Sequence, residues 1–168
     1  MNNNGYIRKI DELGRVVIPK ELRQKLKIHE GENLIINYTD KNINLSKYSY
    51  IENNTDFIKI IGDKVNLITN FNVIITDLEH IIYSNTVHEN FEFPSHLRDY
   101  INKRESTTMQ TLRLNAQEEL SGYISIEPII SNSLCIGLVI MHSEQSNENL
   151  IKFAKLVANI ISIHLDVA

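Results

Sequence analysis

Basic side chains near the start of the chain have the clearest capacity for chemistry. Residues 1–48 hold nine of the 17 Lys and Arg residues but six of the 21 Asp and Glu residues, a formal net charge of +3. The rest of the chain carries −7, so the whole-chain value of −4 hides two oppositely charged parts. Lys and Arg neutralise phosphates and release counterions, which supplies most sequence-independent affinity for DNA. This asymmetry indicates two modules with different partners.

Side chains suited to catalysis or metal binding are scattered. The six histidines lie at positions 29, 80, 88, 96, 142 and 164, without the spacing of a metal site. Cys135 is the single cysteine and lies in an apolar run, which is typical of a small core residue. Gly-rich nucleotide-binding motifs are also missing from the sequence. We therefore expect no enzyme activity, no metal and no cofactor.

Short strands and turns are expected to position the first basic side chains. Residues 6–10 alternate polar and apolar side chains, which predicts a half-buried strand. Residues 11–14 form a turn, in which Gly14 supplies a backbone conformation that other residues resist. Residues 15–18 are β-branched apart from the arginine, which predicts a second strand.

A short helix and a hairpin complete this first module. Pro19 favours the start of a helix that carries Leu22 and Leu26 one turn apart. Residues 34–39 and 42–47 are predicted to pair as a hairpin. So few short elements bury little apolar surface, and domains this small usually need a disulfide, a metal or a partner chain. With no disulfide or metal in prospect, the module is predicted to be an obligate dimer.

A long sequence pattern in this module resembles the AbrB family of bacterial transition-state regulators. Residues 5–23 read GYIRKIDELGRVVIPKELR, and the likeness continues through residues 27–32 to residues 45–48. The resemblance implies a β-barrel in which two chains exchange hairpins. It also implies that this dimer binds DNA.

In that family the DNA contacts come from basic side chains displayed on one face of the dimer. The sequence departs from the family pattern at Gln24, where a second arginine is common. Either Lys25 replaces the lost charge from one residue further on, or this contact with DNA is weaker. The predicted DNA-binding residues are Arg8, Lys9, Arg15, Arg23 and Lys25.

Selectivity for DNA is expected to come from the shape of the duplex. The sequence offers no helix-turn-helix, zinc finger or long basic recognition helix. Base reading is therefore limited, and a preference for A·T-rich or deformable double-stranded DNA is predicted.

The second module is predicted to be a small antiparallel sheet with helices on its faces, in an α+β fold. Its expected order is helix, two strands, helix, three strands and helix, from residue 55 to residue 167. The first strand is predicted at 72–76, Pro94 is predicted to open the second helix, and Asn132-Ser133 is predicted to turn the last two strands as a hairpin. This order resembles a GAF domain, a sensor fold. We predict an AbrB-like domain at 1–48, a polar linker at 49–55 and a GAF-like domain at 56–168.

The last helix carries two apolar stripes. One consists of Leu150, Ala154, Val157 and Ile161, and the other of Phe153, Leu156, Ile160 and Ile163. A surface helix needs one apolar face, so two indicate burial between its own sheet and a second chain. The alternative is a helix fully enclosed in its own domain. If both modules dimerise with different partners, the protein is a tetramer.

A ligand pocket is a further possibility in the second module. Phe91 and Phe93 lie in the segment 82–97 and either line a cavity or plug it. The sequence identifies no small-molecule effector.

The favoured function is a DNA-binding transcriptional regulator. An AbrB-like module followed by a GAF-like one resembles sporulation regulators of this family, which implies a role in sporulation. The alternatives are an antitoxin-like or other protein-interaction module built on an AbrB-type dimer, and a metabolite sensor. A single cysteine, no signal peptide and apolar runs far below the ~20 residues of a membrane span predict a cytoplasmic protein without membrane contact.

Overall fold

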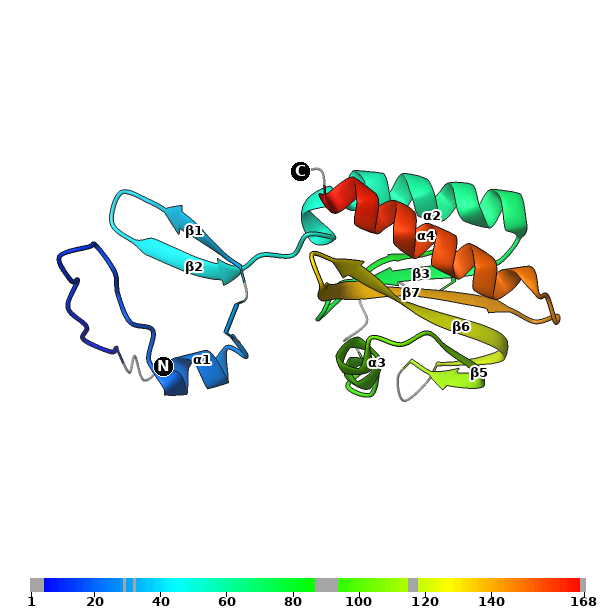
Figure 1. Cartoon of the computed structure of the whole chain (residues 1–168), viewed down its shortest axis with the longest axis horizontal. Coiled ribbons are helices and arrows are strands. Elements are labelled where there is room, and N and C mark those ends of the chain that lie inside the picture. Colours follow the sequence, from blue (N-terminus) through cyan, green and yellow to red (C-terminus); the bar gives the residue numbers. More distant parts are fainter. Residues whose placement is uncertain (1–4, 29, 32, 87–93, 115–117, 167–168) are drawn as a thin grey trace. The chain divides into compact units, whose positions relative to one another are not determined.

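The computed structural model describes residues 5–28, 30–31, 33–86, 94–114 and 118–166. The chain divides into two compact units, Met1–Tyr48 and Ser49–Ala168 (Figure 1).

A β-hairpin and a short helix are the regular elements of the first unit. β1 (Leu34–Tyr38) pairs antiparallel with β2 (Ile43–Lys47), which confirms the predicted hairpin. Its turn is closed by the Thr39 N–H, which donates to the Asn42 carbonyl oxygen at 2.9 Å. α1 (Lys20–Lys25) begins directly after Pro19. The proline fits there because the first N–H groups of a helix have no partner within the helix.

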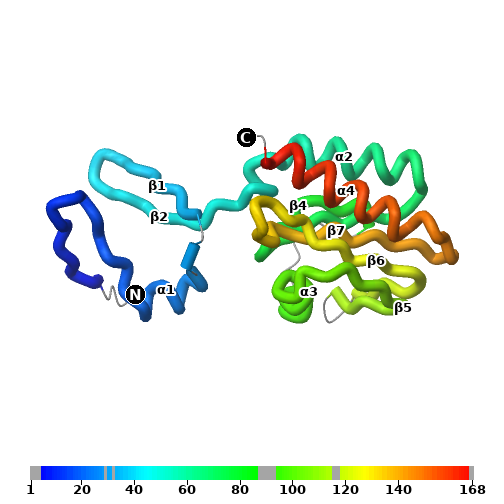
Figure 2. The backbone as a smooth tube through the Cα atoms, in the orientation of Figure 1, coloured from blue at the N-terminus to red at the C-terminus, as the bar shows by residue number. Residues whose placement is uncertain are grey.

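Two other strands predicted for this unit do not form within one chain. The described residues 5–10 and 15–19 take part in no strand pairing, and Figure 2 shows this segment as an open loop before α1. The predicted turn between them is present, since the Gly14 N–H donates to the Asp11 carbonyl oxygen at 3.0 Å. An alternating pattern makes a strand only where a neighbouring strand accepts its hydrogen bonds, and the described residues of one chain supply no such neighbour here.

Large apolar side chains of the first unit remain exposed. Pro19 is the single buried residue among those described in residues 5–48. The exposed large apolar residues are Tyr6, Ile7, Ile10, Leu13, Val16, Val17, Leu26, Ile36, Tyr38, Ile43 and Leu45. One copy of this unit therefore has no hydrophobic core of its own in the described residues.

A five-stranded antiparallel sheet lies at the centre of the second unit, in the order β4-β3-β7-β6-β5. Its strands are β3 (Asn72–Thr76), β4 (Ile81–Ser84), β5 (Thr107–Arg113), β6 (Glu119–Ser131) and β7 (Leu134–Ser143). β6 and β7 form the predicted hairpin, in which Asn132 and Ser133 have positive φ angles of 48° and 65°. Two consecutive residues with positive φ match the right-handed twist of the strands that they join.

Helices cover both faces of this sheet (Figure 1). α2 (Thr55–Thr69) and α4 (Asn149–Asp166) lie on one face, and α3 (Leu97–Lys103) lies on the other. Each face has its own apolar core: Ile58 and Val157 pack with Met141 on the first, and Leu97 packs with Ile126 on the second. The predicted α+β fold is confirmed.

The segment predicted as a linker, 49–55, belongs instead to the second unit. Ile51 is fully buried in the core on the α2 and α4 face, and a short 3-10 helix, η1 (Glu52–Asn54), leads into α2. Gly137 leaves room for Ile51, because a Cβ atom at position 137 would lie 2.4 Å from the Cδ1 atom of Ile51. The polar composition of residues 49–55 indicates a linker, but Ile51 within this segment is a core residue.

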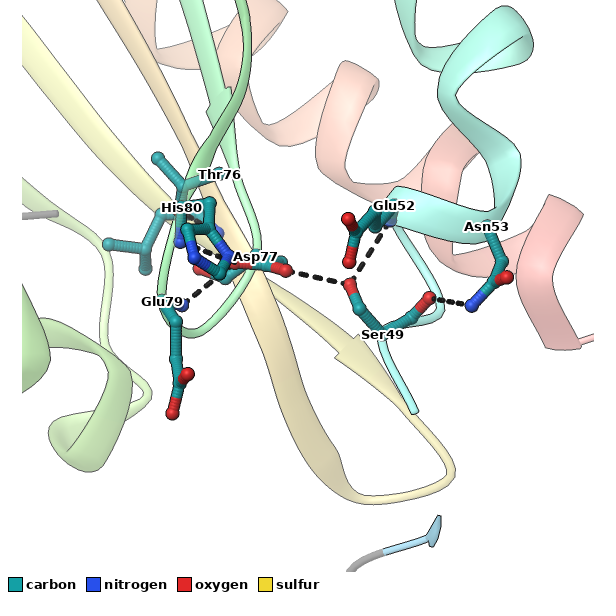
Figure 3. Close-up of polar contacts among 8 residues, drawn as sticks. Ser49, Glu52, Asn53, Thr76, Asp77, Glu79 and His80 are labelled. Carbon is teal, nitrogen blue, oxygen red and sulfur yellow. Dashed lines mark hydrogen bonds and ion pairs between the residues drawn. The ribbon is translucent and has the colours of Figure 1, made fainter. Parts of the chain in front are cut away.

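Hydrogen bonds of Ser49 hold the start of that segment in place (Figure 3). The Ser49 hydroxyl donates to Oδ2 of the buried Asp77 at 2.8 Å and accepts the Glu52 N–H at 3.1 Å. The other carboxylate oxygen of Asp77 accepts the N–H groups of Glu79 and His80 at 2.7 Å and 2.6 Å. The β3–β4 turn therefore anchors the start of the second unit.

Candidate nucleic-acid interface

All five side chains predicted to bind DNA are exposed in the first unit. Arg8, Lys9 and Arg15 lie on the segment before α1, and Arg23 and Lys25 lie on α1. Exposure leaves their charges accessible to phosphate groups.

The turn at residues 11–15 holds one of these side chains in place. Oδ1 of Asp11 accepts the backbone N–H groups of Leu13 at 3.0 Å and Arg15 at 2.8 Å. Oδ2 of Asp11 accepts the Nε–H of Arg15 at 2.7 Å, while the Arg15 side chain stays 71% exposed. The turn thus joins an acidic and a basic side chain on an open surface.

These contacts favour the ionised form of Asp11. The hydrogen bond from the Arg15 N–H, followed by that from the Arg15 side chain, lowers the pKa of Asp11 below its ordinary value of 3.8. The carboxylate is therefore charged at neutral pH. Asp11 is not singled out as a site residue by the sequence analysis. A signal was present, because an Asp side chain in a turn often accepts a hydrogen bond from the backbone N–H two residues on.

Arg8 has local contacts of its own. Its Nη1 donates to the Ile7 carbonyl oxygen at 2.9 Å, and its Cζ lies 5.8 Å from the centre of the Tyr6 ring. That distance is within the range of a cation–π contact. Lys9 is the next residue and is exposed.

α1 presents Arg23 and Lys25 in its last turn. Successive residues of an α-helix are about 100° apart around its axis. Arg23 and Lys25 therefore point to different sides, and Gln24 points between them. A Lys25 contact with DNA therefore comes from a different side of the helix than an Arg23 contact.

The predicted pocket residues Phe91 and Phe93 lie outside the described residues. Elsewhere, a hollow of about 360 Å³ is lined by β5, β6 and the start of α4, including Gln110, Tyr123 and Ile151. The described residues contain no group of three or more His, Cys, Asp or Glu that could hold a metal ion. Across those same residues, none of the helices combines the length and the apolar character that a membrane span requires.

The helices of the second unit also carry exposed apolar side chains. The α4 stripe of Leu150, Ala154, Val157 and Ile161 is buried. The other stripe is not enclosed: Leu156, Ile160 and Ile163 are 51%, 38% and 65% exposed. The alternative of a fully enclosed helix is therefore wrong, because the sheet covers one side of α4. On α2, Ile60, Leu67 and Ile68 are also exposed.

Comparison with known sequences identifies the first unit. Residues 7–53 match the family described as antidote-toxin recognition MazE, bacterial antitoxin. The transition state regulatory protein AbrB of Bacillus subtilis (strain 168) is 54% identical over 48 residues, which are 29% of this chain and 50% of that protein.

A second relative extends over both units. Stage V sporulation protein T of Bacillus subtilis (strain 168) is 32% identical over 156 residues, which cover 86% of each chain. The chain belongs to the stage V sporulation protein T family. Neither of these two relatives is named as an enzyme.

Solved structures resemble the second unit in fold. Residues 122 to 287 of a methyl-accepting chemotaxis protein match with a TM-score of 0.56 at 12% identity, over 67% of this chain and 90% of that one. The cofactor-binding GAF domain of the nutrient sensor CodY from Clostridium difficile matches with a TM-score of 0.47 at 11% identity, over 67% and 92% of the two chains. As a member of the stage V sporulation protein T family, the chain joins an AbrB/MazE-type domain to a second unit that shares its fold with the segment of the chemotaxis protein.

Proposed function

We propose that the protein is a DNA-binding transcriptional regulator of sporulation or transition-state genes. It binds double-stranded DNA, A·T-rich or deformable, through Arg8, Lys9, Arg15, Arg23 and Lys25. The observation that carries the proposal is that these exposed cations lie on the unit that is 54% identical to a transition state regulator. The excess of +3 in this unit supplies electrostatic affinity for phosphates.

The functional form of the first unit is a dimer with exchanged hairpins. Its support is the exposed apolar surface of one copy, together with two extended segments that have no strand partner among the described residues. A second chain would give residues 6–10 and 15–18 their hydrogen-bond partners and would cover the apolar side chains. Dimerisation doubles the charge of the DNA-binding unit to +6.

The second unit links two such dimers into a tetramer, in the cytoplasm. The exposed apolar side chains of α2 and α4 support this step, because a monomer seldom leaves such a patch in water. Tethering raises the effective concentration of the second DNA-binding dimer once the first is bound. The GAF-like domain is also the place where a small effector would act.

Charge reversal tests the DNA-binding face. We expect the double variant Arg15→Glu/Arg23→Glu to lose most affinity for an A·T-rich duplex and to show a shallower dependence of affinity on salt concentration. Lys103→Glu, on the exposed end of α3, makes the same kind of charge change in the second unit and serves as control. Fluorescence anisotropy at several salt concentrations measures both quantities. An unchanged affinity and salt slope in the double variant would refute the assignment.

A second candidate function is an antitoxin-like protein-interaction module. The match of residues 7–53 to the MazE antitoxin family favours it. Purification of the full chain from its host, followed by mass spectrometry, tests this candidate. A small toxin in stoichiometric amount would support it, and recovery of the chain with DNA alone would contradict it.

A further inference from the structure

The two carboxylate oxygens of Asp11 accept hydrogen bonds from different groups. Oδ1 accepts the Leu13 and Arg15 backbone N–H groups and closes the turn, while Oδ2 accepts the Nε–H of Arg15. The turn and the guanidinium are therefore held by different atoms of one side chain. This separation makes the two roles experimentally distinguishable.

We propose that Asp11 is a positioning residue for DNA binding, which holds the Arg15 guanidinium by its Nε–H and leaves the four Nη protons for a phosphate group. The inference rests on the proposed function, in which Arg15 contacts DNA. An arginine has five N–H donors in a planar fork, and its Nη groups suit the oxygens of a phosphate.

The physical advantage for DNA binding is that the Arg15 side chain is already ordered in the free protein. A long exposed side chain loses rotamer freedom when it binds, and that loss weakens binding. Arg15 is 71% exposed, and the bond of its Nε to Asp11 at 2.7 Å restricts it before DNA arrives. The side chain thus loses less freedom on contact with phosphate.

The direction of the change in DNA affinity, when the Asp11 carboxylate is removed, distinguishes positioning of Arg15 from simple charge repulsion. A carboxylate beside a phosphate-binding site repels DNA, so its removal alone strengthens binding. Loss of positioning weakens binding. Glu12 is the matched comparison, because it is exposed, adjacent to Asp11 and makes none of the contacts of Asp11 in the described residues.

The test uses the full chain with Asp11→Asn and, as control, Glu12→Gln. Asparagine keeps an oxygen for the backbone N–H groups but puts an amide nitrogen opposite the Arg15 Nε. We expect Asp11→Asn to weaken binding of an A·T-rich duplex about two- to five-fold, the effect of an exposed ion pair. Glu12→Gln leaves affinity unchanged or raises it. An affinity gain in Asp11→Asn equal to that in Glu12→Gln would overturn the proposal.

A double-mutant cycle shows whether the effect passes through Arg15. In an Arg15→Ala background we expect Asp11→Asn to cause no further loss of affinity; a loss of the same size as in the native chain would contradict the proposal. Arg15→Lys keeps the charge without the Nε fork, so we expect a similar two- to five-fold loss with the Asp11 turn intact. Retained native affinity in Arg15→Lys contradicts positioning through Nε.

The two proposals fail in different ways. If Arg15→Ala retains full affinity, Arg15 does not belong to the DNA face and the proposed function is wrong at that residue. If Arg15→Ala weakens binding but Asp11→Asn does not, the DNA face stands and the positioning role alone is refuted.

Discussion

In the first unit Pro19 is the single buried residue among those described, whereas the second unit buries side chains on both faces of its sheet. Every residue of the described hydrophobic core comes from the second unit, beginning with Ile51. Both units contain many apolar residues, so composition does not cause the difference. A chain of fewer than fifty residues buries only a small share of its surface when it folds alone. The described residues of the unit with the proposed DNA-binding charges thus form no core within one copy, while the other unit has its own core.

The difference has a thermodynamic consequence. A unit whose core forms between two chains is folded only while the chains are associated, whereas a unit with an internal core can stay folded after its chains separate. We therefore expect DNA binding to be lost on dilution before the second unit unfolds. The following variants test that contrast, from the largest expected effect to the smallest.

The largest change in free energy is expected from Ile51→Ala, which lowers the free energy of unfolding of the second unit. Ile51 is fully buried, so truncation removes apolar contacts and leaves a cavity that costs about 2–5 kcal/mol in the free energy of unfolding. Chemical denaturation followed by circular dichroism measures this value. Lys103→Ala is the exposed control, with an expected change within about 0.5 kcal/mol. A change of that small size for Ile51→Ala would show that residues 49–55 are a linker after all.

A smaller change in free energy is expected from Val17→Asp, which weakens dimerisation of the first unit. Val17 is 74% exposed in one chain, where a new charge would be harmless. In a dimer that covers this side chain, the charge must be buried without a partner, so we expect at least about a tenfold weaker dimer and weaker DNA binding. Asn42→Asp adds the same charge in the hairpin turn and serves as control. Sedimentation at several concentrations measures dimerisation, and an unchanged dimer would contradict the contrast between the units.

The smallest effect on domain stability is expected from Ile163→Glu on α4. This side chain is 65% exposed in one chain, so the free energy of unfolding should change by no more than about 0.5 kcal/mol. The assembly should nevertheless fall from tetramer to dimer, because the glutamate lies on the apolar surface of α2 and α4. Light scattering gives the mass. A native mass in this variant would show that α4 takes no part in the tetramer contact. Gln145→Glu adds the same negative charge on an exposed loop and serves as control.

Much of the second unit could be predicted from local pattern. β3 is at the predicted residues 72–76, and the β6–β7 hairpin turns at the predicted Asn132 and Ser133. These predictions succeed because alternation and turn residues act over a few positions. The prediction is less accurate for α3, because the helix begins at Leu97 and not directly at Pro94.

The candidate site was predictable in part. The positions of the basic residues followed from a long family pattern, and all five are exposed. The role of Asp11 was missed, because net charge and spacing do not show which oxygen of a carboxylate accepts which N–H group. The strands predicted at 6–10 and 15–18 do not form for a different reason, since strand pairing requires a neighbour that the part of the chain described in the structure does not provide.

Sequence alone establishes the family, the two oppositely charged modules and the order of helices and strands in the second. It does so because charge, hydrophobic period and turn chemistry are properties of nearby residues. The folded chain adds the burial of Ile51, the anchoring of Ser49 on Asp77 and the pairing of Asp11 with Arg15. Ile51 and Ser49 make contacts with residues distant in the chain, and Asp11 and Arg15 meet through the geometry of a turn. Such contacts depend on where the backbone places each atom, which no local pattern of residue types specifies.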